Sequence, residues 1–315
     1  TTLSKAWYNI RFDYQSSSNL TRDQVHLDNI FDYGYIGAYT KYPTEFYGYY
    51  NNNNNPFAAP RTFVDQNGDT VTLTNFHEQI GFVDTALRFT RSELNPLRAN
   101  YTSNLFEDFD RQGFALRSES NIRLSQGLVN GDNPPNLYGL WAAPGQVSSN
   151  YSKSSNEFFS VLAMGEASLT GPLEKDLNRK PHDLQFGLFF EQSSFNSYGL
   201  NANGLWFLMP QLANTHIQQL DRNNPILTYN SDGVFTDTVK YNRLVQADQQ
   251  TFFDQKLRES LINNGAKDVY GNPYNSTTFI DVNGLSPDQL NIDMFNANEL
   301  LNNGNSYVSY RGYDH

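Results

Sequence analysis

The sequence contains no cysteine among its 315 residues. This absence excludes disulfide bonds, thiolate metal sites and cysteine nucleophiles. Basic residues are also scarce, because 22 lysines and arginines face 33 aspartates and glutamates, for a formal net charge of -11. Nucleic acid phosphates attract basic surfaces, so an acidic chain is poorly suited to them. We therefore expect no nucleic acid partner.

Long hydrophobic runs are missing as well. No stretch of 18 or more apolar residues occurs, so the sequence predicts no transmembrane helix. This criterion does not detect a β-barrel, because a β-barrel crosses a membrane with shorter strands of alternating hydrophobicity. The chain opens at Thr1 with neither a start methionine nor a signal peptide, and we interpret it as a processed or partial chain.

The usual catalytic and metal-binding motifs are also lacking. The five histidines have no metal-ligand spacing, and the Gly-x-Ser-x-Gly, phosphate-loop and dinucleotide motifs do not occur. We therefore expect neither an enzyme nor a cofactor. Residues 65–69 resemble half of a calcium loop, since Asp65, Asn67 and Asp69 alternate around Gly68. Asn-Gly between two apolar stretches is equally typical of a β-hairpin turn, which we favour over a metal site.

What the chain does have is aromatic residues and asparagine. Aromatic residues make up 15% of the chain although hydrophobic residues reach only 38%, and there are 39 asparagines, five of them in a run at 51–55. Asparagine favours turns and disfavours the interiors of helices and strands. We therefore expect long ordered loops.

Alternation with a period of two residues is the strongest positive signal. Between positions 8 and 14, Tyr8, Ile10, Phe12 and Tyr14 alternate with polar residues, which places rings on one face of a strand and charge on the other. The same reasoning predicts strands over 8–14, 25–38, 83–89, 114–124, 158–170 and 184–190. We expect the charged residues on their polar faces to line a watery lumen or to form pairs: Arg11, Asp84, Arg88, Arg117, Glu119 and Arg123.

The connections between these strands alternate in length. Connections of 9, 18 and 10 residues (16–24, 93–110, 172–181) interleave with segments of 40, 31 and 119 residues (39–78, 125–155, 197–315). Short periplasmic turns and long external loops give this order in outer-membrane barrels. The sequence predicts an all-β fold: antiparallel strands of a partial transmembrane β-barrel, with long extracellular loops that contain a few short helices.

Two regions are expected within this fold. Residues 1–196 supply barrel strands, turns and loops, and residues 197–315 form a long extracellular loop region. Within the second region, Phe253, Leu257 and Leu261 recur at helical spacing between 246 and 263, and Ser286-Pro287-Asp288-Gln289 forms a capping box with Gly304 as a later helix end. We expect short helices there.

Aromatic residues in the predicted loops are the candidate binding residues. Flat rings can stack on sugars or contact peptides, although packing inside the loops is the simpler role. These candidates are Tyr138, Trp141, Tyr198 and Trp206.

Several stretches together resemble a known family. They are 31–37, 94–96 with 99–102, 127–134, 138–141, 211–217 and 293–305. In this order they resemble the barrel region of Oar-like TonB-dependent outer-membrane receptors of Bacteroidota, which are related to the SusC group. The resemblance covers nearly the whole chain, and none of its stretches is a catalytic motif.

The resemblance implies a 22-stranded barrel that holds a plug domain and a periplasmic box that engages TonB. Six predicted strands cannot close such a barrel, so we expect the plug and the remaining strands to lie outside this chain. The resemblance further implies a bacterial outer-membrane location, contact with membrane lipid, TonB as a partner through parts absent here, and a surface lipoprotein as a further partner.

Three functions therefore stand open. The first is import of a bulky nutrient, such as a peptide, oligosaccharide or chelate, through a plugged barrel. The second is a receptor-like barrel that acts as a structural or machinery subunit and binds partner proteins through its extracellular loops. The third is a secreted glycan-binding β-sandwich.

Overall fold

A computed structural model describes residues 2–51, 59–65, 68–116, 118–136, 141–145, 148–170, 182–301 and 307–312. The chain is mostly β, in open sheets, with more helix than the sequence predicts. It divides into two compact units, which are described separately. Unit 1 contains residues 1–22, 150–200 and 308–315, and unit 2 contains residues 23–149 and 201–307. The boundary expected at residue 196 therefore differs, because residues 23–149 belong with 201–307.

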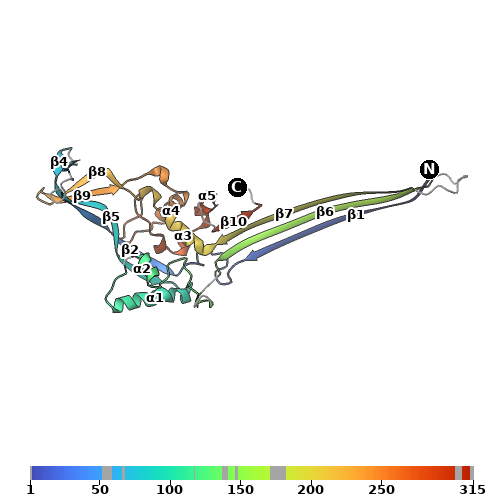
Figure 1. The fold of residues 1–315 in the computed structure, drawn as a ribbon, viewed down its shortest axis with the longest axis horizontal. Helices are drawn as coiled ribbons and strands as arrows, with labels where there is room; N and C mark the ends of the chain where they lie inside the picture. The colour runs from blue at the N-terminus through green and yellow to red at the C-terminus, as the bar shows by residue number, and fades with distance from the viewer. Residues whose placement is uncertain are drawn as a thin grey trace. The chain divides into compact units, whose positions relative to one another are not determined.

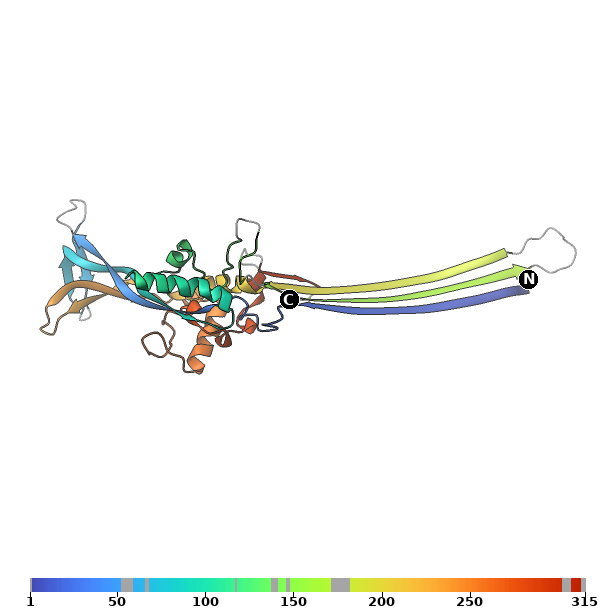
Figure 2. The ribbon, with the colours of Figure 1, turned by 90° about the horizontal axis from the view of Figure 1, so that it is seen from below.

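Unit 1 is a sheet of long strands in the order β1-β6-β7-β10. Its elements are β1 (Thr2–Thr21), β6 (Asn150–Thr170), β7 (His182–Asn201) and the short β10 (Val308–Arg311). The strands β1, β6 and β7 run side by side along their lengths, as Figure 1 and Figure 2 both show. The strands predicted at 8–14, 158–170 and 184–190 are therefore confirmed, although each is longer than expected.

Strand pairing in unit 1 is antiparallel and nearly unbroken. β1 pairs with β6 from Leu3 opposite Leu169 to Thr21 opposite Ser152, with one irregularity between Leu3 and Lys5. Strands of 20 and 21 residues span about 65 Å at the usual rise per residue. Alternating sequence and a continuous ladder of hydrogen bonds thus keep one set of side chains on each face.

Unit 2 contains two sheets. The larger has the order β2-β5-β9-β8, formed by β2 (Gly37–Asn51), β5 (Asn75–Arg91), β8 (Leu220–Tyr229) and β9 (Phe235–Arg243). β5 and β9 pair in parallel at His77 and Glu78, so this sheet is mixed and corrects the expectation of antiparallel pairing throughout. The smaller sheet is the hairpin β3 (Arg61–Val64) and β4 (Thr70–Leu73). The hairpin predicted around residues 65–69 is confirmed, with Gln66 and Asn67 outside the described residues.

Helices cover unit 2. They are α1 (Pro96–Arg111), α2 (Glu119–Leu124), α3 (Ala202–Leu212), α4 (Phe252–Asn263) and α5 (Ala297–Leu301), with single 3-10 turns η1 (Thr215–Ile217), η2 (Ala247–Gln249), η3 (Val282–Gly284), η4 (Pro287–Gln289) and η5 (Ile292–Met294). Figure 2 shows α1 lying along β5. The amphipathic helix predicted within 246–263 is confirmed as α4. The capping box at Ser286 is confirmed too, but it closes only the 3-10 turn η4, and Gly304 lies outside the described residues.

Two predicted strands are wrong. Residues 25–36 form turns in which Tyr33 and Ile36 are fully buried, and strand β2 begins only at Gly37. Buried amides hold these turns, since Asn95 Nδ2 donates to the carbonyls of Asp32 and Tyr35. Long-range partners of this kind outweigh the local alternation of apolar residues.

The strand predicted at 114–124 is a loop followed by helix α2. Ser118 caps this helix, because its hydroxyl accepts a hydrogen bond from the Asn121 amide. Glu119 in the first turn adds favourable charge at the helix start. Ile122 points into the core formed by residues such as Ile36, Tyr39 and Val129. Arg117 lies outside the described residues.

Two predicted connections also differ. Residues 39–78, expected to be one long loop, contain most of β2, all of β3 and β4 and the start of β5. Residues 93–110, expected to be a short periplasmic turn, contain nearly all of the 16-residue helix α1, which begins at Pro96, a residue favoured at the first helical position. These differences leave unit 2 with its own core and sheets.

Candidate functional site

A cavity in unit 2 is the principal candidate binding site. Its volume is about 1070 Å³, at the upper end of the range for ligand pockets. Its walls come from β2, β5 and β8, from the end of β9, and from the loop after α4. The lining residues are Lys41, Pro43, Ile80, Gly81, Phe82, Asp84, Gln218, Gln219, Leu220, Asp221, Arg222, Asn223, Arg243, Leu244, Asp268, Val269, Tyr270, Tyr274, Thr277, Thr278, Phe279 and Asp281.

Arg243 stands between two aromatic rings in this cavity. Its guanidinium carbon lies 4.0 Å from the centre of the Phe82 ring and 5.2 Å from that of Phe279. Its Nη1 donates a hydrogen bond of 3.1 Å to the Ile217 carbonyl. Burial lowers the pKa of Arg243. Within the described part of the chain, no carboxylate lies within ion-pair distance of this guanidinium, so its charge is not compensated by the protein.

A second charged group in the cavity wall is centred on Lys41. The Lys41 ammonium lies 2.6 Å from Glu119 Oε1 and 3.1 Å from Asp281 Oδ1. Asn283 also donates to Glu119 Oε1, over 2.9 Å. Burial raises the pKa of Asp281 to about 6, because the attraction of Lys41 is offset in part by the charge of Glu119. One ammonium therefore serves two carboxylates, and the group keeps a net negative charge.

Three further carboxylates line the cavity without an ion pair to any described residue. Burial raises the pKa of Asp84. Among the described residues, Asp221 accepts hydrogen bonds only from the Asn223 amide and the Asn224 side chain. Within the same part of the chain, Asp268 accepts only from Tyr270 and Asn272, and so closes its own turn. The third lining cation, Arg222, lies 3.4 Å from Glu78, a carboxylate that also pairs with Arg61 over 2.6 Å.

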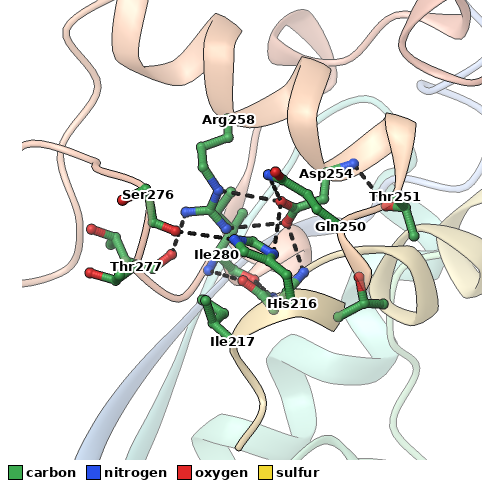
Figure 3. A network of polar contacts seen from close by, with 12 residues as sticks. His216, Ile217, Gln250, Thr251, Asp254, Arg258, Ser276, Thr277 and Ile280 are labelled. Carbon is green, nitrogen blue, oxygen red and sulfur yellow. Dashed lines mark hydrogen bonds and ion pairs between the residues drawn. The ribbon is translucent and has the colours of Figure 1, made fainter. Parts of the chain in front are cut away.

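A buried polar network holds one wall of the cavity in place (Figure 3). Asp254 on α4 is fully buried and accepts hydrogen bonds from Arg258, from the Asn214 amide and from Gln250. Burial alone would raise the pKa of Asp254, but these donors outweigh it and hold the pKa below its ordinary value. Arg258 Nη1 donates in turn to the carbonyls of Asn275 and Thr278, over 2.8 and 2.7 Å.

His216 completes this network. Its Nε2 donates to the Ser276 carbonyl over 3.1 Å, and its Nδ1 lies 3.4 Å from Asp254 Oδ2. The Asn214 side chain exchanges two hydrogen bonds of 2.8 Å with the backbone of Ile280. The network fixes the loop after α4, which contributes Thr277, Thr278, Phe279 and Asp281 to the cavity lining. In this loop Phe279 contacts Arg243, and Asp281 pairs with Lys41.

Unit 1 presents a different candidate surface, an exposed apolar face. On β1 the side chains of Tyr8, Ile10, Phe12 and Tyr14 are 83%, 54%, 69% and 69% exposed. They stand opposite Gly165, Ala163, Val161 and Phe159 of β6. The Phe186 ring of β7 lies over Gly165, and the Phe190 ring lies 6.3 Å from Phe159. We call this the apolar face of unit 1: Tyr8, Ile10, Phe12, Tyr14, Phe159, Val161, Ala163, Leu184, Phe186, Leu188 and Phe190.

The opposite face of the same sheet is mixed: charged and polar side chains alternate there with the apolar side chains of Trp7, Phe158, Leu162, Met164 and Phe189. Trp7 donates to Glu166 over 3.1 Å, and Gln185 donates to the same carboxylate over 3.3 Å. Arg11 and Asp13 form an ion pair of 2.9 Å. The sheet of unit 1 thus has one continuous apolar face and one mixed face on which the polar pairs lie.

The candidate residues from the sequence lie elsewhere. Tyr138 lies outside the described residues. Trp141 is 68% exposed, whereas Tyr198 is half-buried on β7 with its ring 6.2 Å from Tyr151. Trp206 is a core residue of α3, 1% exposed, and its Nε1 donates to the Phe31 carbonyl over 3.1 Å. None of the three described residues lines the cavity, so the loop aromatics and the cavity are separate features.

Sequence reasoning missed most of the cavity. Of its charged residues only Asp84 had been singled out, for its place on a polar strand face. Lys41 and Asp281 lie 240 positions apart, and no local pattern links them. Asp221, Arg243 and Asp268 stand in turns or at strand ends, where a charged residue ordinarily meets solvent.

Comparisons with known proteins identify no relative of this chain. No family model, curated protein or solved structure matches the chain. Among the described residues, no helix combines the length and apolar character needed to cross a membrane. The same part of the chain holds no cluster of three or more histidine or acidic side chains arranged to bind a metal ion.

Proposed function

We propose that this chain is part of a bacterial outer-membrane, TonB-dependent receptor that imports a bulky nutrient through a plugged β-barrel. In this proposal the strands of unit 1 belong to the barrel wall, and unit 2 is the part at the cell surface that captures the nutrient. TonB would act through other parts of the receptor, as the family resemblance implies.

The two faces of the unit 1 sheet are the observation that carries the proposal. Eight side chains of the apolar face are at least half exposed on β1 and β7: Tyr8, Ile10, Phe12, Tyr14, Leu184, Phe186, Leu188 and Phe190. A continuous exposed apolar patch of this kind needs a cover, and hydrocarbon is one. The opposite face carries the charged side chains of the sheet, with an ion pair between Arg11 and Asp13 and the shared Glu166, and a watery lumen would solvate these groups.

Strand length supports the same proposal. A tilted strand needs about 9 to 11 residues to cross the hydrocarbon layer. β1, β6 and β7 have 20, 21 and 20 residues. They are long enough to cross the bilayer and to continue beyond it, as strands that carry a surface domain would.

The cavity of unit 2 supports capture rather than a purely structural role. Its volume of about 1070 Å³ and its mixture of charged, amide and aromatic lining suit a ligand larger than a single amino acid or sugar. The carboxylates and guanidinium that it leaves unpaired offer charge to a ligand.

The test is a matched pair of arginine substitutions in β1 of the full-length protein, expressed in cells with an outer membrane. Ile10→Arg places a charge on the apolar face, and Asn9→Arg places the same charge on the opposite face one residue away. A lipid-facing arginine near the midplane costs about 2–4 kcal/mol. We expect Ile10→Arg to reduce the amount of heat-modifiable protein that stays with carbonate-washed outer membranes by severalfold, and Asn9→Arg to leave it nearly unchanged.

Two results would count against the proposal. Release of the unsubstituted protein into the soluble fraction would remove the membrane assignment and favour a secreted glycan-binding protein. Retention in the membrane without uptake of any nutrient, combined with co-purification of a surface lipoprotein, would favour the machinery subunit instead.

A further inference from the structure

We infer that the cavity of unit 2 binds a short basic peptide, with Arg243 holding the C-terminal carboxylate and Asp84, Asp221 and Asp268 attracting its lysine or arginine side chains. The inference names the ligand class of the capture site and rests on the proposed function for the route by which the peptide arrives. Binding itself is a property of the cavity and is measured apart from transport.

Arg243 is the anion-binding end of the cavity. The rings of Phe82 and Phe279 hold its guanidinium at 4.0 and 5.2 Å, and a single carbonyl, that of Ile217, accepts from its Nη1. A guanidinium offers five N–H donors in a planar fork that matches a carboxylate. Since no carboxylate of the described chain reaches this fork, a ligand carboxylate is the partner that compensates both its charge and its free donors.

The carboxylates of the cavity determine the charge expected on the rest of the ligand. Asp84, Asp221 and Asp268 have no ion pair within the described chain, while Asp281 shares one lysine with Glu119. The cavity therefore holds more uncompensated negative than positive charge. A cationic ligand is attracted to such a surface, whereas a ligand that carries only negative charge is repelled.

Phe82 connects the two ends of the cavity. It contacts Arg243 and precedes Asp84 by two positions on β5, so the two side chains share one face of the strand at a spacing of about 7 Å. Phe279 and Asp281, in the loop after α4, have the same two-residue separation, and both line the cavity. An anion site and a cation site thus lie within reach of one short chain that carries both charges.

A peptide fits the remaining lining as well. Gln218, Gln219 and Asn223 supply amide donors and acceptors for a peptide backbone. Tyr270 and Phe279 are 55% and 44% exposed, and their faces attract ammonium and guanidinium groups. An uncharged saccharide would use the amides and rings but would leave Arg243 and three carboxylates uncompensated.

The experiment compares trilysine with a free C-terminal carboxylate and trilysine with a C-terminal amide. Each is titrated into the purified full-length protein in detergent, at low salt, by calorimetry. We expect the amide to bind about tenfold more weakly, because it lacks the charge-assisted pair with Arg243. In Arg243→Gln the free acid should fall to the affinity of the amide, while the amide itself changes by less than threefold. The comparison on the unsubstituted protein needs no variant and so survives any folding defect of Arg243→Gln.

A second set of variants tests the carboxylates. Asp84→Asn and Asp221→Asn keep side-chain shape, and each should weaken both trilysine forms by about fivefold or more. Asp232→Asn is the matched control, since it removes the same charge from an exposed turn outside the cavity, and it should change affinity by less than twofold. Affinity for both forms should also fall as salt rises.

Four results would overturn the inference. These are equal affinity for the free acid and the amide, equal effects of the cavity and control variants, tighter binding of triglutamate, and tighter binding of cellotriose, an uncharged sugar. If the membrane test gives the expected result but the peptide titrations do not, the proposed function stands and only the ligand class is rejected. If the unsubstituted protein is soluble but binds trilysine as expected, the membrane role is rejected and the peptide site stands.

Discussion

Lys41 and Asp281 lie 240 positions apart in the sequence, yet the Lys41 ammonium stands 3.1 Å from Asp281 Oδ1 in the wall of the cavity. Glu119 lies 2.6 Å from the same ammonium, so the three residues join β2, α2 and the segment before η3. Asp281 Oδ2 is buried and has no hydrogen-bond partner among the described residues. The carboxylate of Asp281 is therefore only partly compensated.

This partial compensation makes the stability of unit 2 depend on pH. The pKa of Asp281 is raised from 3.8 to about 6, chiefly by burial. The folded state then binds a proton more tightly than the unfolded state, so the contribution of Asp281 is full below about pH 4 and is lost as the pH rises through about 6. Asp281→Asn should remove this loss, which amounts to about 3 kcal/mol at most.

The measurement is urea unfolding in detergent at pH 4, 5, 6 and 7, followed by tryptophan fluorescence, to which the buried Trp206 of unit 2 contributes. The difference in free energy of unfolding between Asp281→Asn and the unsubstituted protein should grow with pH across this range. Asp232→Asn serves as the control and should show the pH dependence of the unsubstituted protein. A constant difference across the four pH values would contradict the raised pKa.

Removal of the Arg258 side chain should strongly destabilise unit 2. Arg258 Nη2 lies 3.2 Å from Asp254 Oδ1, and the side chain of Asp254 is 0% exposed. Arg258→Ala leaves a buried carboxylate without its cation and frees the carbonyls of Asn275 and Thr278, at a cost of about 3–5 kcal/mol. Chemical unfolding of the full-length protein measures the loss.

Lys256→Ala on the same helix is the control for Arg258→Ala. Lys256 pairs with Glu259, but both side chains are 40–50% exposed (42% and 47%), so the change should cost less than about 1 kcal/mol. Similar losses for the two variants would show that the Arg258–Asp254 pair is not desolvated.

Two glycines with similar backbone angles should differ in their tolerance of alanine. Gly131 has a φ of +89° and a Cβ there would stand 2.7 Å from the Asn203 carbonyl, whereas Gly233 has a φ of +75° with nothing within 4 Å. Gly233→Ala should cost about 1 kcal/mol, from backbone strain alone. Gly131→Ala should cost at least about 2 kcal/mol more, as overpacking adds to the strain. Thermal unfolding of both variants compares them, and equal shifts would contradict the close contact.

Replacement by phenylalanine should destabilise the protein at Trp206 and leave its stability nearly unchanged at Trp141. Trp206→Phe removes the hydrogen bond to the Phe31 carbonyl and part of a buried ring, for a loss of about 1–3 kcal/mol. Trp141→Phe, at a side chain that is 68% exposed, should stay within about 0.5 kcal/mol. Acrylamide should quench a smaller share of the tryptophan fluorescence in Trp141→Phe than in Trp206→Phe, because Trp141 is exposed and Trp206 is buried. Equal quenching of the two would place Trp206 at the surface.

Elements decided by neighbouring residues were predictable. The strands β1, β6 and β7 follow from alternation over many residues, and the β3–β4 hairpin follows from the turn chemistry around Gly68. Helix α4 follows from Phe253, Leu257 and Leu261 at helical spacing. The predictions at 25–38 and 114–124 failed, because there the alternation was short and other interactions outweighed it. Ser118 with Glu119 was a helix-start signal present in the sequence itself.

The sequence alone determined the long alternating strands, the hairpin, helix α4 and the acidic charge, because each depends on residues within about ten positions or on composition. Only the tertiary structure decided the turns around Tyr33 and the cavity, since Asn95, Asn130, Lys41 and Asp281 find their partners at distances of 60 to 240 positions. These pairs form because a buried amide or charge needs a hydrogen-bond or ion-pair partner. The partner comes from whichever segment the fold places beside it, so the local sequence does not identify it.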